Sequence, residues 1–274
     1  MNKKLRSFLI WVLVTLFTFA IAYYQRSTGP TYDKKGEIII DDNVYKYKMI
    51  RSHGGEGDAI CHLLIPDTSV SGFYIYQKIN SNEEETRENL KRKGDTLFLA
   101  IPHQPPAGKV RYNVFLEKDS KEYSLTEESV VVRFKGYVPL SVLIPHVIIM
   151  FLAMLFSTRT GIEALIKGKN TLPFTVITVI LFFTGGLILG PVVQKYAFGA
   201  YWTGWPFGHD LTDNKTLVAF IVWLIALIRL FRNRSNRGWV IAAAIVLLAV
   251  YLVPHSMFGS ELDYSTGEVG TGNQ

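Results

Sequence analysis

Cysteine is almost absent from this chain, which has one, Cys61, among its 274 residues. A single thiol excludes an intramolecular disulfide, a C-x-x-C redox motif and a thiolate metal cluster. The chain also lacks a P-loop, an H-E-x-x-H motif and a Ser-His-Asp spacing. The familiar classes of soluble enzyme therefore have no support, and Cys61, set in a predicted strand, is interpreted as a small buried apolar group.

Long apolar runs are absent from the middle of the chain, which is polar and charged, and are concentrated in a short N-terminal block and in the half after residue 137. This distribution predicts membrane spans flanking a soluble insert rather than one large soluble core. The two last runs are short for a span of roughly 20 residues, and a re-entrant pair is the alternative to two crossings. The Arg-rich link between them favours crossings, which gives five predicted spans: residues 8–24, 138–156, 172–193, 217–230 and 239–253.

Lys and Arg are nearly missing from two outer segments: the loop 194–214 has only Lys195, and the tail after residue 253 has none. Basic residues cluster instead before the first span, between the second and third, and between the fourth and fifth. Because cytoplasmic loops carry the excess of Lys and Arg, the N-terminus is predicted inside and the C-terminus outside. The clusters sit at span ends, so the net charge of +6 indicates the lipid bilayer, not nucleic acid, as partner.

The first span also fits a cleaved signal peptide, because Lys3, Lys4 and Arg6 precede its apolar run. No A-x-A cleavage pattern follows, so an uncleaved anchor over residues 1–30 is expected. Residues 31–136 are then an extracytoplasmic domain, 137–253 a four-helix transmembrane domain, and 254–274 an extracytoplasmic tail.

Residues 31–136 favour strands, since short β-prone runs alternate with turn residues. The segment 94–116, with its Pro105-Pro106-Ala107-Gly108 turn, resembles the end of an immunoglobulin or fibronectin III-like module, which implies a sandwich fold and no activity. The predicted fold class is thus a membrane all-α bundle with an all-β sandwich inserted after the first helix. The predicted strands are residues 37–40, 44–50, 59–65, 72–79, 96–101, 110–116 and 129–134.

Two other features of this domain have plain interpretations. The charged run 82–93 is predicted to be a solvated loop or short surface helix, with a recognition surface as the alternative. His53 and His62, near Glu56 and Asp58, suggest a metal site, but the glycine-rich spacing favours a hairpin turn.

The loop 194–214, here called the Trp-rich loop, joins the third and fourth spans. Its aromatic residues, including Trp202 and Trp205, are typical of a belt at the lipid headgroups. A belt does not explain His209, Asp210 and the polar residues after them, which are costly near lipid unless they are paired or bind a ligand. A functional loop is therefore predicted.

The run from Trp202 to Asp210, followed by Trp223, resembles the outer loop of cytochrome c assembly and haem-handling membrane proteins. That resemblance implies haem near Trp202 and Trp205, with His146 and His255 as flanking ligands. The family's compact Trp-Gly-x-x-Trp-x-Trp-Asp-Pro run is not reproduced.

The tail supplies a second polar cluster on the same predicted face, with His255, Glu261 and Asp263. Together with His209 and Asp210 it offers imidazoles and carboxylates for a divalent metal such as Zn, Mn or Fe. The alternative is a solvated acidic tail.

His146 lies inside the second span, where an ionisable residue is a functional hypothesis by default. Its alternative role is a neutral side chain bonded to a neighbouring helix.

A broader likeness covers most of the chain. The runs Arg133–Gly136, Ile144–His146 and Ser157–Gly161, with the tail from Pro254 to Tyr264, are similar to an uncharacterised family of bacterial polytopic membrane proteins. The likeness implies a bacterial cytoplasmic (inner) membrane protein and no particular activity.

Three functions remain open. The first is a non-catalytic accessory or assembly factor that holds a metal or haem at its outer face. The second is a membrane anchor presenting the sandwich to a membrane or periplasmic protein partner. The third is an enzyme acting on a lipid or isoprenoid, using His209, Asp210, Asp213 and His255.

Overall fold

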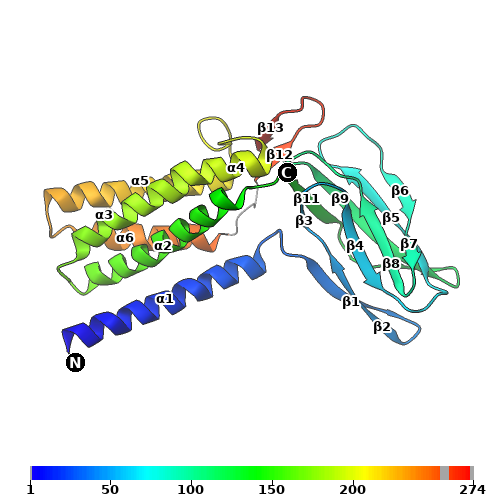
Figure 1. Ribbon diagram of the computed structural model, residues 1–274, viewed down its shortest axis with the longest axis horizontal. Helices are drawn as coiled ribbons and strands as arrows, with labels where there is room; N and C mark the ends of the chain where they lie inside the picture. The colour runs from blue at the N-terminus through cyan, green and yellow to red at the C-terminus, as the bar shows by residue number, and fades with distance from the viewer. Residues whose placement is uncertain (1, 254–258, 272–274) are drawn as a thin grey trace.

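Helices occupy one end of the molecule and strands the other (Figure 1). This computed structural model describes residues 2–253 and 259–271. The chain begins at the far end of the helices, crosses to the β domain through α1, and returns to the helices through α2 (Figure 1).

Four helices of the described chain are long and apolar enough to cross a membrane, which is the pattern of a membrane protein. They are α1 (Lys3–Thr28), α2 (Leu140–Leu165), the continuous segment Thr171–Phe198, and α5 (Leu211–Arg232). The third consists of α3 (Thr171–Phe182), the π-helix η1 (Phe183–Leu189) and α4 (Gly190–Phe198).

The fifth predicted span forms α6 (Arg237–Leu252), which is apolar but only 16 residues long. At 1.5 Å per residue such a helix is about 24 Å long, short of a hydrocarbon core of about 30 Å. Four of the five predicted spans therefore correspond to helices that are long and apolar enough to cross a membrane.

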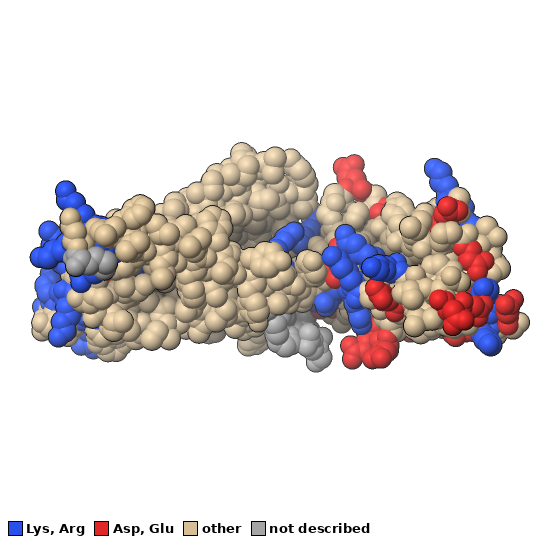
Figure 2. Space-filling model, turned by 90° about the horizontal axis from the view of Figure 1, so that it is seen from below, with Lys and Arg blue, Asp and Glu red and all other residues tan. Residues whose placement is uncertain are grey.

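Charge is distributed along the helices as a bilayer requires. On the face shown in Figure 2, basic side chains gather at the far end and again at the border with the β domain, and the surface between them carries no charge. Because a charged side chain in hydrocarbon is costly, this uncharged belt is the surface suited to lipid.

The β domain is built from three sheets around one apolar core. β1 and β2 form an antiparallel hairpin, β4, β8 and β7 form a second sheet, and β3, β11, β9, β5 and β6 follow one another in the largest, with β10 beside β9. Alternate residues of the strands face the core, which includes Tyr112 and Phe134. The bounds are β1 Lys34–Ile40, β2 Asn43–Met49, β3 Ser52–Gly54, β4 Ala59–Leu64, β5 Ser71–Lys78, β6 Thr86–Asn89, β7 Lys91–Lys93, β8 Thr96–Ile101, β9 Lys109–Lys118, β10 Lys121–Ser124 and β11 Val130–Lys135.

All seven predicted strands are present, and Cys61 is buried as predicted, at 1% exposure. The interpretation of the run 82–93 as a loop or helix holds for residues 82–85 and is wrong for most of the rest, which forms β6 and β7. These are edge strands, where charged side chains are tolerated and oppose edge-to-edge association. These two strands contain no apolar residues, so the alternation of apolar and polar residues that marks other strands could not reveal them.

Glycines let the third helical segment pack closely between its neighbours. A Cβ on Gly185 would lie 2.9 Å from Met150 Sδ on α2, and one on Gly186 would lie 3.1 Å from Thr216 Cγ2 on α5. Small residues at helix contacts bring backbones together in membranes. The helices thus form one bundle, with the fully buried Trp223 in its core.

Candidate functional site

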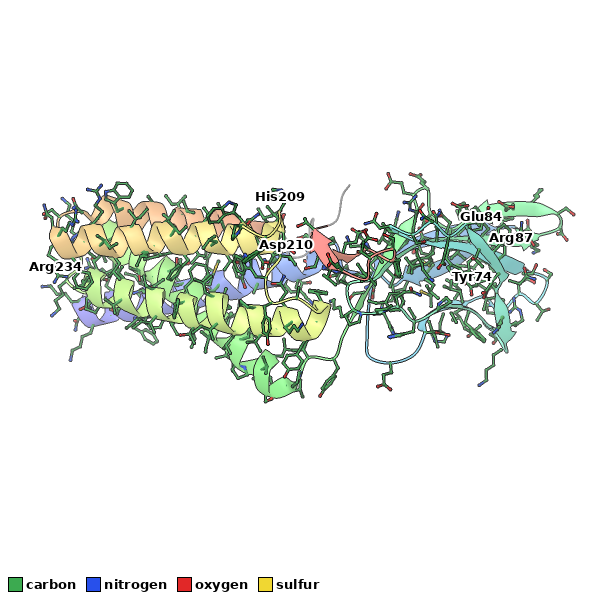
Figure 3. All side chains as sticks on the ribbon, turned by 90° about the horizontal axis from the view of Figure 1, so that it is seen from above. Tyr74, Glu84, Arg87, His209, Asp210 and Arg234 are labelled. Atoms are coloured by element: carbon green, nitrogen blue, oxygen red, sulfur yellow. The ribbon has the colours of Figure 1, made fainter. Side chains whose placement is uncertain are left out.

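The Trp-rich loop and the tail meet the β domain in one place, here called the junction. The tail contributes β12 (Ser260–Leu262) and β13 (Val269–Thr271), which form a small hairpin. His209 and Asp210 lie at the end of the helices next to the β domain, and Arg234 lies at the opposite end (Figure 3). The polar groups that the sequence places in a loop and a tail therefore share one region.

Asp210 is buried and saturated with hydrogen bonds. Its Oδ1 caps α5 by accepting from the backbone N of Thr212 at 2.7 Å, as an Asp N-cap does. Its Oδ2 accepts from the backbone N of Ser260 at 2.9 Å and from Thr203 Oγ1 at 3.1 Å. One carboxylate thus joins α5, the Trp-rich loop and the tail.

Asp213, one helical turn further on, shapes the loop. Its Oδ2 accepts from the backbone N of Thr203 at 2.7 Å and of Gly204 at 3.0 Å. Gln194 Nε2 donates to the same oxygen at 3.1 Å and to Thr203 Oγ1 at 2.9 Å. Buried carboxylates need such donors because an unsatisfied one is costly, so the loop conformation and Asp213 stabilise each other.

Arg133 connects the β domain to the tail. Its Nη2 donates to the carbonyl oxygen of Ser260 at 2.6 Å, and its guanidinium stacks 3.8 Å from the centre of the Phe198 ring. Burial lowers the pKa of Arg133 to about 10, against the opposing effect of Asp210 and Glu261. The charge is therefore retained at neutral pH.

Glu261 makes the second tie between tail and β domain. Lys109 Nζ lies 2.6 Å from Glu261 Oε2, and Asn80 Nδ2 donates to Oε1 at 2.8 Å. The Glu261 side chain is 4% exposed in this pair. The neighbouring backbone agrees, because Leu262 N donates to the carbonyl oxygen of Ala107 at 3.1 Å.

The other predicted site residues do not converge on these carboxylates. His209 is exposed, and its backbone N donates to Thr271 Oγ1 at 2.8 Å. Asp263 is used locally in a turn, where its Oδ1 accepts from the backbone N of Ser265 at 2.8 Å. Trp202 Nε1 donates to the carbonyl oxygen of Trp205 at 3.0 Å. His255 lies outside the described residues, and its place in a shared site with His209 stays a prediction.

His146 belongs to the helices and not to the junction. Its Nδ1 lies 3.0 Å from the carbonyl oxygen of Gly185 in η1. A π-helix leaves carbonyls without their usual α-helical partner, and π-bulges recur at functional sites. The structure thus has the hydrogen bond to a neighbouring helix that was the alternative interpretation of His146.

These contacts test whether the junction suits a metal. No group of three or more His, Cys, Asp or Glu side chains that could hold a metal occurs within residues 2–253 and 259–271. The lone pairs of Asp210 and Glu261 are directed at protein donors. Within the described residues, the carboxylates of the junction therefore serve as internal connections.

Several residues of the junction carry no sequence signal. Thr203, Gln194 and Ser260 are common residues at unremarkable spacings, and only the fold brings them to Asp210 and Asp213. Arg133 is a partial exception. It follows three valines in a predicted strand, and a buried Arg is rarely found without a hydrogen-bonding or charged partner.

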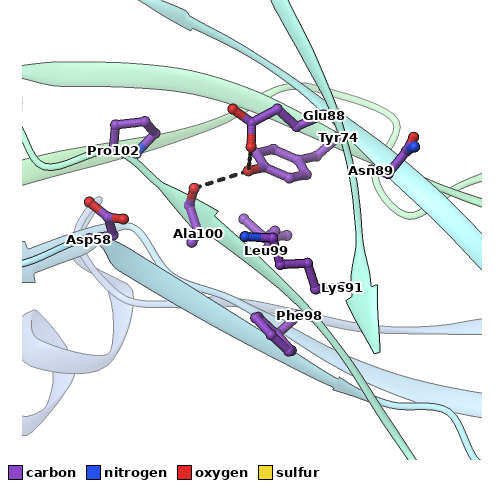
Figure 4. Close-up of a pocket in the computed structure, with 9 residues that line it drawn as sticks. All are labelled: Asp58, Tyr74, Glu88, Asn89, Lys91, Phe98, Leu99, Ala100 and Pro102. Atoms are coloured by element: carbon purple, nitrogen blue, oxygen red, sulfur yellow. Dashed lines mark hydrogen bonds between the residues drawn. The ribbon is translucent and has the colours of Figure 1, made fainter. Parts of the chain in front are cut away.

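The β domain has a small pocket of about 150 Å³ between β5, β6 and β8 (Figure 4). The Tyr74 hydroxyl lies 2.5 Å from Glu88 Oε2 and 3.0 Å from the carbonyl oxygen of Ala100. Burial, and then Glu88, raise the pKa of Tyr74, which stays protonated. The pocket is smaller than the roughly 300 Å³ of ordinary ligand sites, and its Tyr74 and Glu88 side chains bond to each other.

The comparisons with known proteins give no relative on which to base a function. No family model matches the chain, and neither a curated protein nor a solved structure matches it.

Proposed function

We propose that this protein is a non-catalytic accessory or binding factor of the bacterial cytoplasmic membrane. It presents its β domain to a protein partner on the outer, periplasmic side of that membrane. In this proposal five helices cross the bilayer, with the N-terminus inside and the C-terminus outside. The β domain is an immunoglobulin- or fibronectin III-like sandwich on the periplasmic side. The basic far end and the uncharged belt support the orientation (Figure 2).

The short helix α6 is compatible with a crossing. Arg237 begins it, and a long basic side chain at a helix end can reach the headgroups. A short helix is also accommodated by local thinning of the bilayer.

The junction supports a mounting role. Asp210, Asp213 and Glu261 are each bonded to groups from other elements, so the carboxylates hold the β domain on the helices. A general acid or base needs a site open to substrate. A rigid attachment sets the distance of the binding surface from the membrane and its orientation, which suits an accessory factor.

An exposed apolar stripe on the β domain carries the proposal. Ile39 and Val44 face each other across the β1–β2 hairpin and are 63% and 54% exposed. Leu64, on β4, is 65% exposed. Lys118 Nζ bonds both Asp41 at 2.7 Å and Asp67 at 2.8 Å, which keeps the hairpin turn beside the end of β4. Apolar groups gathered on a water-exposed domain indicate an interaction surface.

The neighbours of the stripe indicate the chemistry of the partner. Lys46 and Lys48 alternate with core-facing residues on β2 and point outward beside Val44, where they lie 3.7 Å from Glu37 and 3.1 Å from Asp33. A protein with an apolar patch and a rim of both charges complements this surface.

A photo-crosslinking side chain at position 64 of the full-length protein in intact cells tests the proposal. We expect an adduct of one discrete mass from position 64 that disappears when Ile39 is changed to Glu. The exposed Glu122, on β10 of the largest sheet, is the control position and should give no such adduct. Equal labelling from both positions would contradict a specific surface.

A second measurement separates this proposal from a haem or metal factor. Purified full-length protein should show no haem absorption and less than one equivalent of bound metal. A stoichiometric metal or a haem spectrum would favour the alternative in which Trp202, Trp205, His146 and His209 serve a cofactor.

A further inference from the structure

The first turns of α2 expose apolar side chains on one side of the helices. Pro145 lies inside α2, where it removes a backbone hydrogen bond and bends the helix. The turns before the bend project sideways from the bundle (Figure 3). Four apolar side chains on either side of Pro145 are at least half exposed: Leu140 60%, Ile144 50%, Val147 55% and Ile148 53%.

The ring contacts between α1 and α2 run from the far end to just past the middle of the two helices. The rings of Trp11 and Phe156 lie 5.3 Å apart, and those of Phe19 and Phe151 lie 4.8 Å apart. Towards the junction α1 turns to α6 instead, where Gln25 Nε2 donates to the carbonyl oxygen of Tyr251 at 2.8 Å. The two helices therefore diverge, and the surface beneath the projecting turns is hollowed (Figure 2). We call this hollow the α1–α2 crevice.

Cations stand at the end of the crevice nearest the β domain. Arg26 lies in the last turn of α1, and Lys135 ends β11 just before α2. Figure 2 shows basic side chains at this end of the hollow. Burial lowers the pKa of Lys135, and the like charges of Arg133 and Arg26 lower it further, so these cations are close enough to repel.

Nothing in the described chain neutralises Arg26 and Lys135. Within residues 2–253 and 259–271 neither side chain makes a hydrogen bond or an ion pair. Arg133 differs, because it is tied to Ser260. Two uncompensated cations above an apolar crevice match an anionic headgroup above acyl chains.

We propose that the α1–α2 crevice binds one lipid of the adjacent leaflet, whose phosphate-bearing anionic headgroup is held by Arg26 and Lys135. The acyl chains lie along Leu140, Ile144 and Val147. The proposal is independent of a protein partner for the β domain, since it concerns the helical border and not the apolar stripe. A bound lipid also fills the space that Pro145 opens.

Native mass spectrometry of the full-length protein in detergent, titrated with phosphatidylglycerol, tests the site. We expect Arg26→Gln and Lys135→Gln each to lower lipid occupancy, by roughly fivefold per cation removed. Lys195→Gln is the matched control: this cation belongs to α4 and bonds the carbonyl oxygen of Gly199 at 2.6 Å. It should leave occupancy unchanged.

Two further arms separate the parts of the ligand. Ile144→Trp fills the crevice and should reduce lipid occupancy while Arg26 and Lys135 remain. Phosphatidylcholine should bind more weakly than phosphatidylglycerol, and inorganic phosphate alone should not displace the lipid. Displacement by inorganic phosphate would overturn the lipid assignment in favour of a free phosphate site.

Thermal unfolding provides a readout that does not depend on detecting adducts. Because like charges surround Lys135, Lys135→Gln should unfold at the same or a higher temperature without lipid. Phosphatidylglycerol should raise the unfolding temperature of the wild type more than that of either variant. Equal lipid stabilisation of wild type and variants, or an equal loss with Lys195→Gln, would overturn the proposal.

Discussion

Gly136 occupies the point where β11 runs into the helices. Its backbone N donates to the carbonyl oxygen of Ala197 at 2.9 Å, which joins the strand end to α4. A Cβ at this position would overlap the carbonyl oxygen of Tyr196. The close approach of two backbones is therefore the reason for glycine here.

Gly136→Ala should destabilise the full-length protein by about 1–3 kcal/mol, because overpacking forces the backbone of α4 away. Thermal unfolding in detergent measures the effect. Gly54→Ala is the control, since a Cβ there meets nothing within 4 Å. Equal unfolding temperatures for Gly136→Ala and wild type would show that the contact contributes nothing.

Arg133 is the buried cation of the junction, at 5% exposure. Arg133→Ala should cost about 1.5–3 kcal/mol, the range for a hydrogen bond to a charged group. Limited proteolysis should then cut the tail sooner, because Ser260 loses its donor. The control is Arg111→Ala, which removes an exposed Arg on the neighbouring strand β9. It should change neither the free energy of unfolding nor the rate of proteolysis of the tail, and an effect comparable to that of Arg133→Ala would contradict a specific role for Arg133.

Among the elements, the turn of the β1–β2 hairpin is tied to the segment after β4 by one basic residue. Lys118 joins Asp41 in the hairpin turn to Asp67 after β4. The hydrogen bond from Lys118, followed by those from Ser69, lowers the pKa of Asp67. A depressed carboxyl pKa contributes stability that is present above the ordinary pKa and lost as the pH falls.

Acidification should therefore lower the unfolding temperature of the wild type more than that of the Asp67→Asn variant. We expect the difference in unfolding temperature between the two proteins to be constant near neutral pH and to shrink below about pH 4. The reason is that protonation of Asp67 removes its preference for the Lys118 ammonium. Unfolding temperatures of both full-length proteins between neutral pH and pH 3 provide the check; a difference that grows on acidification would contradict the sign.

Buried polar groups also act between helices at the far end. Arg159 Nη1 lies 2.7 Å from Glu163 Oε2 one turn on, and its guanidinium lies 5.4 Å from the Trp11 ring of α1. Such a pair is costly to bury unless it is matched. The arrangement fixes α1 on α2 where the α1–α2 crevice is closed.

For the whole molecule, the orientation in the membrane is the testable property. Burial raises the pKa of the Cys61 thiol, so the native cysteine reacts slowly and gives a low background. We expect an impermeant thiol reagent to label Glu268→Cys in intact cells and Ser235→Cys only after permeabilisation. Both positions are exposed, the first in the tail and the second between α5 and α6. The reverse pattern would overturn the predicted orientation.

The sequence by itself determined the long helices and the seven predicted strands, since apolar runs, turn residues and basic clusters act within a few positions of the chain. Residues 96–101, for example, form β8 with the predicted bounds. The length of an apolar run is likewise a local property of the sequence, although the bounds of α6, Arg237–Leu252, were seen only in the structure.

Only the tertiary structure decided the site. Asp210 and Ser260 are 50 positions apart, and Arg133 and Ser260 are 127 apart, so no spacing rule connects them. The α1–α2 crevice likewise depends on how two helices diverge, which neither helix encodes alone. Composition limits what a segment forms because backbone preferences are local, whereas hydrogen bonds between distant segments exist only once packing has brought their donors and acceptors together.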